Sequence, residues 1–391
     1  MWSTGTVAIP NVTGNIVITV ETTAVTISSI SAIYNQSGTV FITDSLDSLK
    51  DDLTVTATWS DSSTTIVSSS EYTLSGTLAE GSNTITVSYG GQTATFTVIA
   101  KKMGYDDYVD TTIPTTGQHI LTASDFTSTS DYTTGGVTYI RLYGYNANYT
   151  NVIMPATMNG KTTMTQVASS SPSSGNTSFA GNTTIQYVTF EDNCVFGDGG
   201  QPNNSGAGAF YGCTNLIGVS NVPTAVNTLS RAFYGCTNLS FIDNLDDLVN
   251  VTSLYMAFQE SGVEYIQDLS SWTALASIQA CFKQSKLIRP FGFPELASSV
   301  AGTNFYANCS YLEYAIVPEG VNGLLYGFYS DSALRQVDIY ADSIPSSGIE
   351  STTFSGCNNL TVYCHHNTTT EASLISAYGS STKVTILNFD D

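Results

Sequence analysis

Cysteine and histidine are the residue types in this sequence with the strongest metal-binding and nucleophilic chemistry, and Cys364, His365 and His366 stand next to one another. Zinc sites use ligands that are spaced along the chain, and adjacent residues on a strand point to opposite faces. We therefore interpret this cluster as a surface loop near the end of the chain and predict no metal site.

Catalysis by a Ser-His-Asp or Cys-His arrangement needs a histidine that is held against a nucleophile and an orienting acid. His119, His365 and His366 lie in no recognisable signature of this kind, and no phosphate-binding loop, His-Glu-x-x-His or dinucleotide motif is present. We predict a non-enzymatic protein without catalytic residues or cofactors. Because paired carboxylates that cleave glycosides leave no short motif, a carbohydrate-active enzyme is retained as the third hypothesis.

Acidic runs such as residues 243–247 and Asp106-Asp107 offer carboxylates to calcium. They lack the alternating ligand loop and the closing glutamate of a calcium loop, so we interpret them as solvated turns.

The charge of the chain is strongly negative, with Lys+Arg 11 against Asp+Glu 32 and a net charge of −21. Such a chain has few cations with which to contact phosphates, which argues against binding nucleic acid or anionic lipid. No stretch approaches the roughly 18–20 apolar residues of a membrane-spanning helix, so no membrane insertion is predicted. No secretory signal follows Met1, and we expect either export by another route, such as lysis, or a leader outside this sequence.

Repeats determine the architecture that must position these residues. Residues 209–216 and 232–239 both contain the run Ala-Phe-Tyr-Gly-Cys-Thr-Asn-Leu, and related copies occur along the second half of the chain. Their aromatic anchors are Phe179, Phe210, Phe233, Phe258, Phe282, Tyr306, Phe328 and Phe354. From Phe210 onward the anchors are 23, 25, 24, 24, 22 and 26 residues apart. One such turn cannot bury its own apolar residues, so neighbouring turns must stack around a shared core.

Three features of the stacked core follow from this period. We expect the anchor rings to form one internal column and the leucines of the copies to form a second. The segment after each leucine, such as residues 217–219 or 335–339, is expected to add one short strand to a parallel sheet.

Four cysteines occupy one position of the repeat: Cys213, Cys236, Cys309 and Cys357. The same position holds Ser261, Ser285 and Asp331 in other copies, which would interrupt a framework of disulfides. Because cysteine packs as a small apolar residue, we predict reduced thiols in a buried column.

The pattern Ala-Phe-x-x-Cys-x-x-Leu-x-x-Val, followed by Val-Pro at residues 222–223 and 317–318, resembles the BspA-like class of bacterial leucine-rich repeats. Residues 152–161 are similar to the opening repeat of that family. The resemblance covers roughly residues 137–388 and implies a solenoid with short parallel strands. The copies at Phe258 and Phe282 depart from the pattern, because they are one residue shorter between anchor and strand.

The first hundred residues have a different pattern. Apolar and polar residues alternate over residues 53–59 and 85–89, and the alternation resumes after Gly90-Gly91, which predicts strands and a tight β-hairpin. With Trp59 as an expected core residue, these strands predict an immunoglobulin-like sandwich over residues 23–100. This run resembles bacterial Ig-like domains of surface proteins and phage structural proteins, and residues 6–20 resemble a segment of tail and other virion proteins of phages that infect gut Firmicutes.

The predicted fold is therefore mostly β, an Ig-like β-sandwich followed by a solenoid. Residues 1–22 are interpreted as an N-terminal strand segment for attachment or assembly, 23–100 as the sandwich, 101–136 as a linker and β-rich N-terminal cap, and 137–391 as the solenoid. A short helix at residues 372–379 and a strand at 383–387 are expected to cap its C-terminal end.

Candidate ligand-binding residues stay unknown at this level. The longest insertion between copies contains residues 196–206, which we interpret as a flexible excursion. Tyrosines that could stack on sugars or on a partner, although most solenoid aromatics serve packing, are Tyr143, Tyr145, Tyr149, Tyr211 and Tyr234.

The preferred hypothesis is a non-enzymatic phage virion protein, fibre-like, decorative or receptor-binding, that attaches to a bacterial surface. Its expected partners are a bacterial surface glycan or protein or other virion proteins, and a homo-oligomer is left open. The expected location is the virion or the extracellular space. The alternative hypothesis is a BspA-like adhesin on the bacterial cell surface.

Overall fold

A computed structural model describes residues 24–38, 40–41, 44–79, 81–101, 112–168, 171–288, 292–296 and 300–389. The chain divides into two compact units, Met1–Met103 and Gly104–Asp391, and each contains its own hydrophobic core. The fold is mostly β, as predicted. The predicted strand segment at residues 1–22 and the acidic pair Asp106-Asp107 lie outside the described residues, and the predicted domain boundaries stay predictions.

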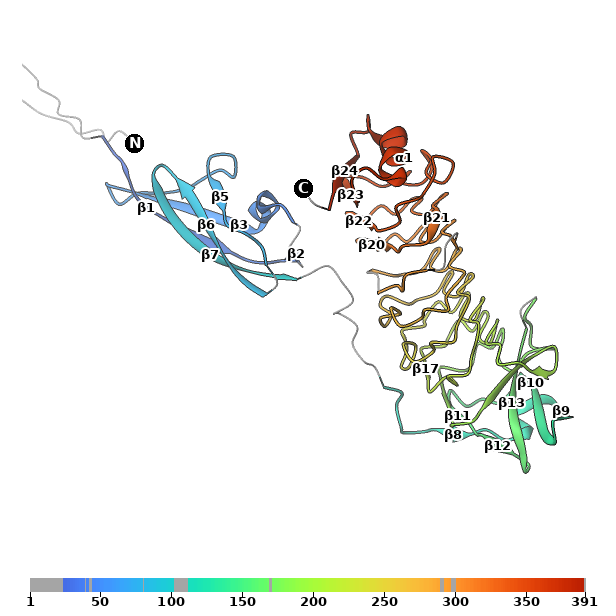
Figure 1. The fold of residues 1–391 in the computed structure, drawn as a ribbon. Coiled ribbons are helices and arrows are strands. Elements are labelled where there is room, and N and C mark those ends of the chain that lie inside the picture. The colour runs from blue at the N-terminus through green and yellow to red at the C-terminus, as the bar shows by residue number, and fades with distance from the viewer. Residues whose placement is uncertain are drawn as a thin grey trace, which may run out of the picture. The chain divides into compact units, whose positions relative to one another are not determined.

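The N-terminal unit is a sandwich of two sheets (Figure 1). One sheet contains antiparallel strands in the order β1 (Ile27–Tyr34), β3 (Leu53–Trp59) and β4 (Thr64–Ile66). The other contains β2 (Val40–Phe41), β7 (Gln92–Lys101), β6 (Gly81–Tyr89) and β5 (Thr73–Ser75), with a 3-10 helix, η1 (Leu46–Asp52), between β2 and β3. This arrangement confirms the predicted Ig-like fold.

The predicted hairpin joins β6 to β7. Tyr89 pairs with Gln92, so the two glycines between them form the turn. Gly90 and Gly91 have φ values of 55° and 81°, a left-handed conformation that glycine adopts without a steric penalty. The alternation of β6 directs Ile85 and Val87 into the core.

Trp59 is not a core residue, and this prediction is wrong. It has the inward parity of β3, but it is the last residue of the strand, where the chain turns back with Ser63 as its backbone partner. Its half-buried ring therefore lies at the rim of the sandwich, and its Nε1 donates to Thr65 Oγ1 at 3.0 Å. Aromatic volume in the core comes instead from Tyr72 and Phe96.

The second unit is a solenoid of stacked coils (Figure 1). Short parallel strands form a sheet near its beginning, in the order β18 (Phe241–Ile242), β17 (Gly218–Ser220), β14 (Tyr187–Phe190), β11 (Asn151–Met154) and β8 (His119–Ile120). Near its end a second parallel sheet contains β20 (Tyr314–Val317), β22 (Gln336–Ile339), β23 (Leu360–Cys364) and β24 (Val384–Asn388). Two further short strands, β19 (Val300–Ala301) and β21 (Val321–Gly323), pair with each other.

The anchor rings form the predicted internal column. All eight are buried, and successive centroids lie 5.3–5.7 Å apart with planes within 21° of parallel. The predicted leucine positions are buried as well: Leu216, Leu239, Leu312, Leu334 and Leu360. Each coil thus contributes one ring and one aliphatic side chain to a shared core, as the repeat period requires.

The prediction of one strand after every copy is wrong in the middle of the solenoid. The copy that begins at Phe258 has no strand at the predicted position, although its ring is fully buried, whereas the corresponding segment after Phe282 lies partly outside the described residues. These copies are one residue shorter between anchor and strand. A shift of one residue reverses which side chains face the core, so the ladder cannot continue in register while the apolar residues stay inside.

The insertion at residues 196–206 is not the flexible excursion that we predicted. Its first part forms a hairpin of β15 (Val195–Asp198) and β16 (Gln201–Pro202), and Phe196 is buried. The hairpin extends a sheet with the order β16, β15, β13 (Lys161–Val167), β10 (Val137–Tyr145) and β9 (Phe126–Thr134), with β12 (Thr157–Met158) beside β13. Pairing with β13 and burial of Phe196 provide the order that the polar sequence did not reveal.

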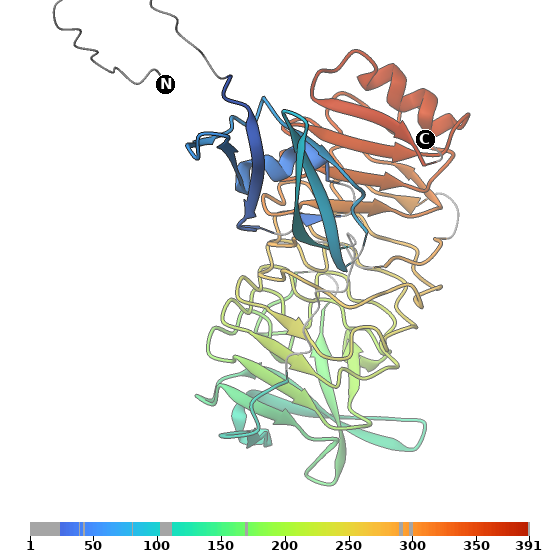
Figure 2. The same ribbon diagram turned by 90° about the vertical axis from the view of Figure 1, so that its left-hand side faces the viewer.

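The predicted C-terminal helix and strand are confirmed as α1 (Thr369–Tyr378) and β24. Thr368 is the N-cap of α1, with its side chain accepting from the Glu371 N–H, and Gly379 is the C-cap. Figure 2 shows α1 beside the last strands of the solenoid, where Tyr378 and Leu374 close the core. None of the helices in the described part of the chain is long and apolar enough to cross a membrane.

Candidate functional site

The Cys364-His365-His366 cluster lies where β23 ends and the chain turns toward α1. Cys364 is buried, whereas the two imidazoles point to different carboxylates. His365 Nδ1 lies 2.7 Å from Asp342 Oδ1, and His366 Nδ1 lies 3.1 Å from Glu371 Oε1. Across the residues that the structure describes, no three His, Cys, Asp or Glu side chains come together as a metal site.

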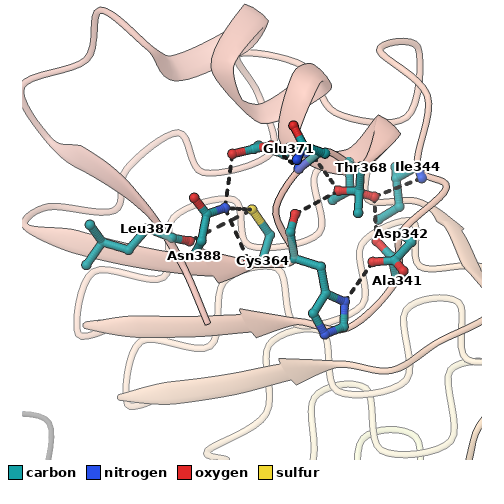
Figure 3. Close-up of polar contacts among 11 residues, drawn as sticks. Ala341, Asp342, Ile344, Cys364, Thr368, Glu371, Leu387 and Asn388 are labelled. Atoms are coloured by element: carbon teal, nitrogen blue, oxygen red, sulfur yellow. Dashed lines mark hydrogen bonds and ion pairs between the residues drawn. The ribbon is translucent and has the colours of Figure 1, made fainter. Parts of the chain in front are cut away.

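Glu371 connects this loop to the first turn of α1 and to the last strand (Figure 3). Its carboxylate accepts from Asn388 Nδ2 at 3.0 Å and from the Asn367 N–H at 2.7 Å. These hydrogen bonds and His366 hold the pKa of Glu371 below its usual value. The arrangement is that of a structural hydrogen-bond network, which anchors the turn by charge-assisted contacts.

His119 forms a pair with a buried acid at the start of the solenoid. Its Nε2 lies 3.1 Å from Asp125 Oδ2, and its ring stacks on Tyr149 with centroids 3.5 Å apart. Burial raises the pKa of Asp125, but hydrogen bonds from Thr122 and His119 outweigh it and lower the net value. The nearby Thr122 hydroxyl donates to the carboxylate rather than to the imidazole, so the three residues do not form a nucleophile–base–acid relay.

The repeat cysteines form the predicted buried column. Each thiol donates to the carbonyl of the anchor residue in the preceding copy: Cys213 to Phe179 at 3.1 Å, Cys236 to Phe210 at 3.0 Å, Cys309 to Phe282 at 2.8 Å and Cys357 to Phe328 at 3.3 Å. All seven cysteines of the chain are free and buried. Burial raises the pKa of Cys213 to about 12, and a thiol that stays protonated is a poor nucleophile.

Asp331 occupies the cysteine position of its copy and is fully buried. Its Oδ1 accepts from the Cys309 N–H at 2.7 Å, whereas its Oδ2 has no hydrogen-bond partner. Burial raises the pKa of this carboxyl well above its usual value. It contacts the interior of the stack, so its position gives it a structural rather than a ligand-binding role.

The acidic run at residues 243–247 links neighbouring coils. Asp243 accepts from the Asn221 N–H at 2.9 Å and from the Ser220 hydroxyl. Asn244 Oδ1 accepts from the Val222 N–H at 2.9 Å. The prediction of solvated turns therefore misses that these side chains bond one coil to the preceding one.

The nominated tyrosines do not gather at one place. Tyr145 is buried and donates to the Tyr149 carbonyl at 2.7 Å, so it serves packing. Tyr211 and Tyr234 stack with centroids 4.9 Å apart outside the core, and Tyr234 donates to Glu260 Oε1 at 2.8 Å. Tyr143 lines a pocket.

That pocket has a volume of about 380 Å³, and its lining includes residues of β10, β13 and β15. It is lined mainly by polar side chains and glycines: Arg141, Tyr143, Gln166, Val167, Ala168, Gly175, Asn176, Asp198, Gly199 and Gly200. Its volume is at the lower end of the range for small-molecule sites.

Arg141 and Gln166 supply the donors of this pocket. The two terminal nitrogens of Arg141 donate to main-chain carbonyls, of Gly200 at 3.5 Å and of Asp131 at 3.1 Å. Gln166 is 1% exposed, and its Oε1 accepts from the Tyr143 hydroxyl at 3.5 Å. Arg141 Nε and Gln166 Nε2 are buried and have no hydrogen-bond partner.

Sequence reasoning named Tyr143 and the insertion but not the pocket that they share. Arg141 and Gln166 were missed, because they are distant along the chain and meet only through the parallel pairing of β10 with β13. The one usable signal was Arg141 itself, a cation within an apolar alternating segment of a chain with Lys+Arg 11.

Comparison with known families bears on both units. Residues 36–99 match the bacterial Ig-like domain (group 3). Residues 158–274, 250–361 and 278–388 match the BspA type leucine rich repeat region, in 6 copies. A search of curated proteins finds no match. Because the repeat matches together span residues 158–388, well over half of the sequence, the chain belongs to the BspA-type leucine-rich-repeat family and carries a bacterial Ig-like domain before its repeats.

Proposed function

We propose that this chain is a non-enzymatic attachment protein of a phage virion that binds a bacterial surface glycan or protein. The observation that carries the proposal is the combination of modules in one chain. An Ig-like domain and BspA-type repeats together fit a surface adhesin or binding protein. Both modules are of non-catalytic types, and function on such folds resides in surfaces placed on a rigid framework.

The chemistry of the described side chains supports a binding role over a catalytic one. The histidines pair with carboxylates, two of which, Asp125 and Glu371, also accept from backbone N–H groups, and the repeat thiols stay protonated in the core. A solenoid, by contrast, presents a long series of similar surface positions on a stiff core, which suits recognition of an extended partner.

The virion assignment rests on residues 6–20, which resemble a segment of phage tail and virion proteins and lie outside the described residues. The joint occurrence of Ig-like and repeat modules also supports it. The alternative, a BspA-like adhesin of a bacterial cell surface, is supported equally by the family match. A homo-oligomer is compatible with either.

Binding to whole bacteria tests the attachment role. Fluorescently labelled full chain is incubated with a panel of Gram-positive gut bacteria and counted by flow cytometry, with a labelled unrelated acidic protein as control. We expect saturable binding to some strains, reduced by excess unlabelled chain. Equal staining by both proteins, or staining of no strain, would contradict the proposal.

Proteomics of purified particles separates the two locations. If the protein belongs to a virion, mass spectrometry of density-purified phage from producing cultures finds its peptides in a constant ratio to the capsid protein. Peptides that occur only in the bacterial envelope fraction would favour the adhesin.

A further inference from the structure

We propose that the Arg141 pocket, defined by the ten residues given above, binds the carboxylate of an acidic sugar unit such as a hexuronate. This inference rests on the proposed attachment role and specifies the chemistry of one of its contacts. The observations that carry it are two buried donors without acceptors, an arginine whose charge faces carbonyls rather than a carboxylate, and a turn that is shaped around that arginine.

The unpartnered donors indicate that an acceptor is missing. Gln166 is 1% exposed, yet its Nε2 has no hydrogen-bond partner, and the same holds for Arg141 Nε. A buried donor that gives up water without gaining an acceptor destabilises the fold, so such groups call for an explanation. Both donors belong to residues that line the pocket, so a ligand oxygen that reached them would supply the missing acceptors.

Arg141 makes a carboxylate the favoured acceptor. Its terminal nitrogens donate to the Gly200 and Asp131 carbonyls, which are neutral, so neither contact is an ion pair, although Asp198 brings one carboxylate to the lining of the pocket. Its guanidinium also lies over the Tyr132 ring, 5.3 Å from the centroid, which restricts its rotamers. A planar, fixed guanidinium binds carboxylates with charge-assisted hydrogen bonds that are stronger than those to neutral oxygens.

Strand pairing fixes the geometry of the donors before any ligand arrives. In the parallel pairing of β10 with β13, Arg141 lies beside Met164, and Gln166 follows two residues later on the same face. Gln166 in turn lies beside Gly197 of β15. A preformed site of this kind loses little conformational entropy on binding.

The turn between β15 and β16 is built to accommodate the arginine. Gly200 has a φ of +80°, and a Cβ at this position would lie 2.7 Å from Arg141 Nη1. Any other residue would therefore displace the guanidinium. Gly200 is thus required both for the conformation of the turn and for the position of the Arg141 guanidinium.

The remaining lining favours a sugar as the carrier of the carboxylate. Tyr143 offers an aromatic ring, whereas the amide of Asn176 is already hydrogen-bonded to Ser171 and Ser173. Few apolar side chains line the pocket, which disfavours a fatty acid. A volume of about 380 Å³ suits a single small polar ligand.

Isothermal titration calorimetry of the full chain tests the site with sodium D-glucuronate, with D-glucose and sodium acetate as matched probes. We expect glucuronate to bind at least tenfold more tightly than either control, because only glucuronate supplies both ring and carboxylate. If acetate binds as tightly as glucuronate, the pocket binds anions only adventitiously. If glucose binds as tightly as glucuronate, the carboxylate does not contribute to binding. Either result, or no binding of glucuronate, would overturn the proposal.

Variants of the two donors sharpen the test. Arg141→Met should weaken glucuronate binding at least tenfold, whereas Arg231→Met, which removes an arginine that lies over Tyr255 away from the pocket, should leave it unchanged. Gln166→Leu should weaken binding severalfold while the melting temperature stays equal or rises, because it removes an amide nitrogen without a partner. Unchanged affinity in both pocket variants would contradict the site.

The attachment role and the pocket proposal can be contradicted independently of each other. If the full chain binds bacteria but not glucuronate, the pocket proposal is wrong and the attachment role stands. If it binds glucuronate but no bacteria, the pocket stands and the attachment role is wrong. Loss of both activities in Arg141→Met, with wild-type melting behaviour, would connect the pocket to attachment.

Discussion

The copies that begin at Phe258 and Phe282 are held in the solenoid differently from the copies on either side of them. The flanking copies pair through short parallel strands, β14 with β17 on one side and β20 with β22 on the other. The Phe258 copy has no strand at this position, yet its ring and that of Phe282 have the most nearly parallel stacking of the column, 5.4 Å apart at 1°.

This difference shows which interaction makes the solenoid continuous. Backbone hydrogen bonds still join the middle coils at the anchors, such as Phe258 N–H to the Cys281 carbonyl at 2.9 Å and Glu260 N–H to the Lys283 carbonyl at 2.9 Å. The buried side chains continue without interruption from one end to the other. We infer that the side-chain columns, together with the backbone bonds at the anchors, maintain the stacking where the strand ladder is missing.

Removing a middle ring is expected to have the largest effect. Phe282→Ala should lower the free energy of unfolding of the repeat unit by about 3–5 kcal/mol, the usual cost of emptying a buried aromatic site, and Phe233→Ala should cost about as much despite its neighbouring strands. Urea denaturation of the full chain measures both. Tyr326→Ala, which truncates an exposed ring, is the control with an expected change near zero. A Phe282→Ala cost far below that of Phe233→Ala would contradict the role of the rings.

Replacing Asp331, the buried acid of the cysteine column, tests the same core through the pH dependence of its stability. Burial raises the folded-state pKa of Asp331 above the value of about 3.9 expected for the unfolded chain. Below that pH both states are protonated; as pH rises above it, the unfolded state ionises first and stability falls until the folded pKa is reached. Asp331→Asn keeps an acceptor for the Cys309 N–H and cannot ionise.

We therefore expect Asp331→Asn to be more stable than the natural chain by about 1–3 kcal/mol at neutral pH, the usual cost of an unsatisfied buried polar group. The difference should shrink as pH falls toward the unfolded pKa. Thermal unfolding across this pH range checks both points, and a difference that grows on acidification would show that Asp331 is ionised and stabilised in the fold.

A smaller effect is expected from the thiols that bridge consecutive copies. Cys236→Ala removes the donor to the Phe210 carbonyl and a little volume, and should cost about 1 kcal/mol. Cys236→Ser keeps the donor and is the matched comparison. Because the cysteines are free, adding a reductant should leave the melting temperature unchanged. A fall in the melting temperature with reductant would reveal a disulfide.

The smallest effect is expected at the rim of the sandwich. Trp59→Phe should cost no more than about 1 kcal/mol, because the ring is half-buried and loses only the hydrogen bond to Thr65. Phe96→Ala, within the sandwich core, should cost several times more. Equal losses of stability in the two variants would indicate that Trp59 is a core residue.

Side-chain periodicity predicted the solenoid well. A ring that recurs every 22 to 26 residues can be buried only if successive coils stack and share a core. Periodicity could not predict the loss of the strand after Phe258, since a deletion of one residue alters backbone register without altering composition. The alternation along residues 53–59 correctly gave the side of the strand from which Trp59 projects. It could not show that Trp59 ends the strand and therefore lies at the rim of the core.

The candidate site was beyond sequence reasoning for a different reason. Arg141 and Gln166 belong to two strands and Gly200 to a turn, and only the order of the strands in the sheet brings them together. The polar composition around Gly200 is typical of a loop, and the strand pairing that orders it depends on β13, about forty residues earlier in the sequence. The cluster that the sequence analysis singled out, Cys364 with His365 and His366, forms structural hydrogen bonds instead.

Hydrogen exchange of the full chain, followed by mass spectrometry, tests the central claim most directly. If the side-chain columns make the solenoid one continuous body, peptides from residues 258–288 should be protected by global opening, with rates that match those from the strand-bearing copies and that rise together in Phe282→Ala. Fast, independent exchange of this middle segment, with both flanking regions still protected, would show two separate bodies and contradict the account.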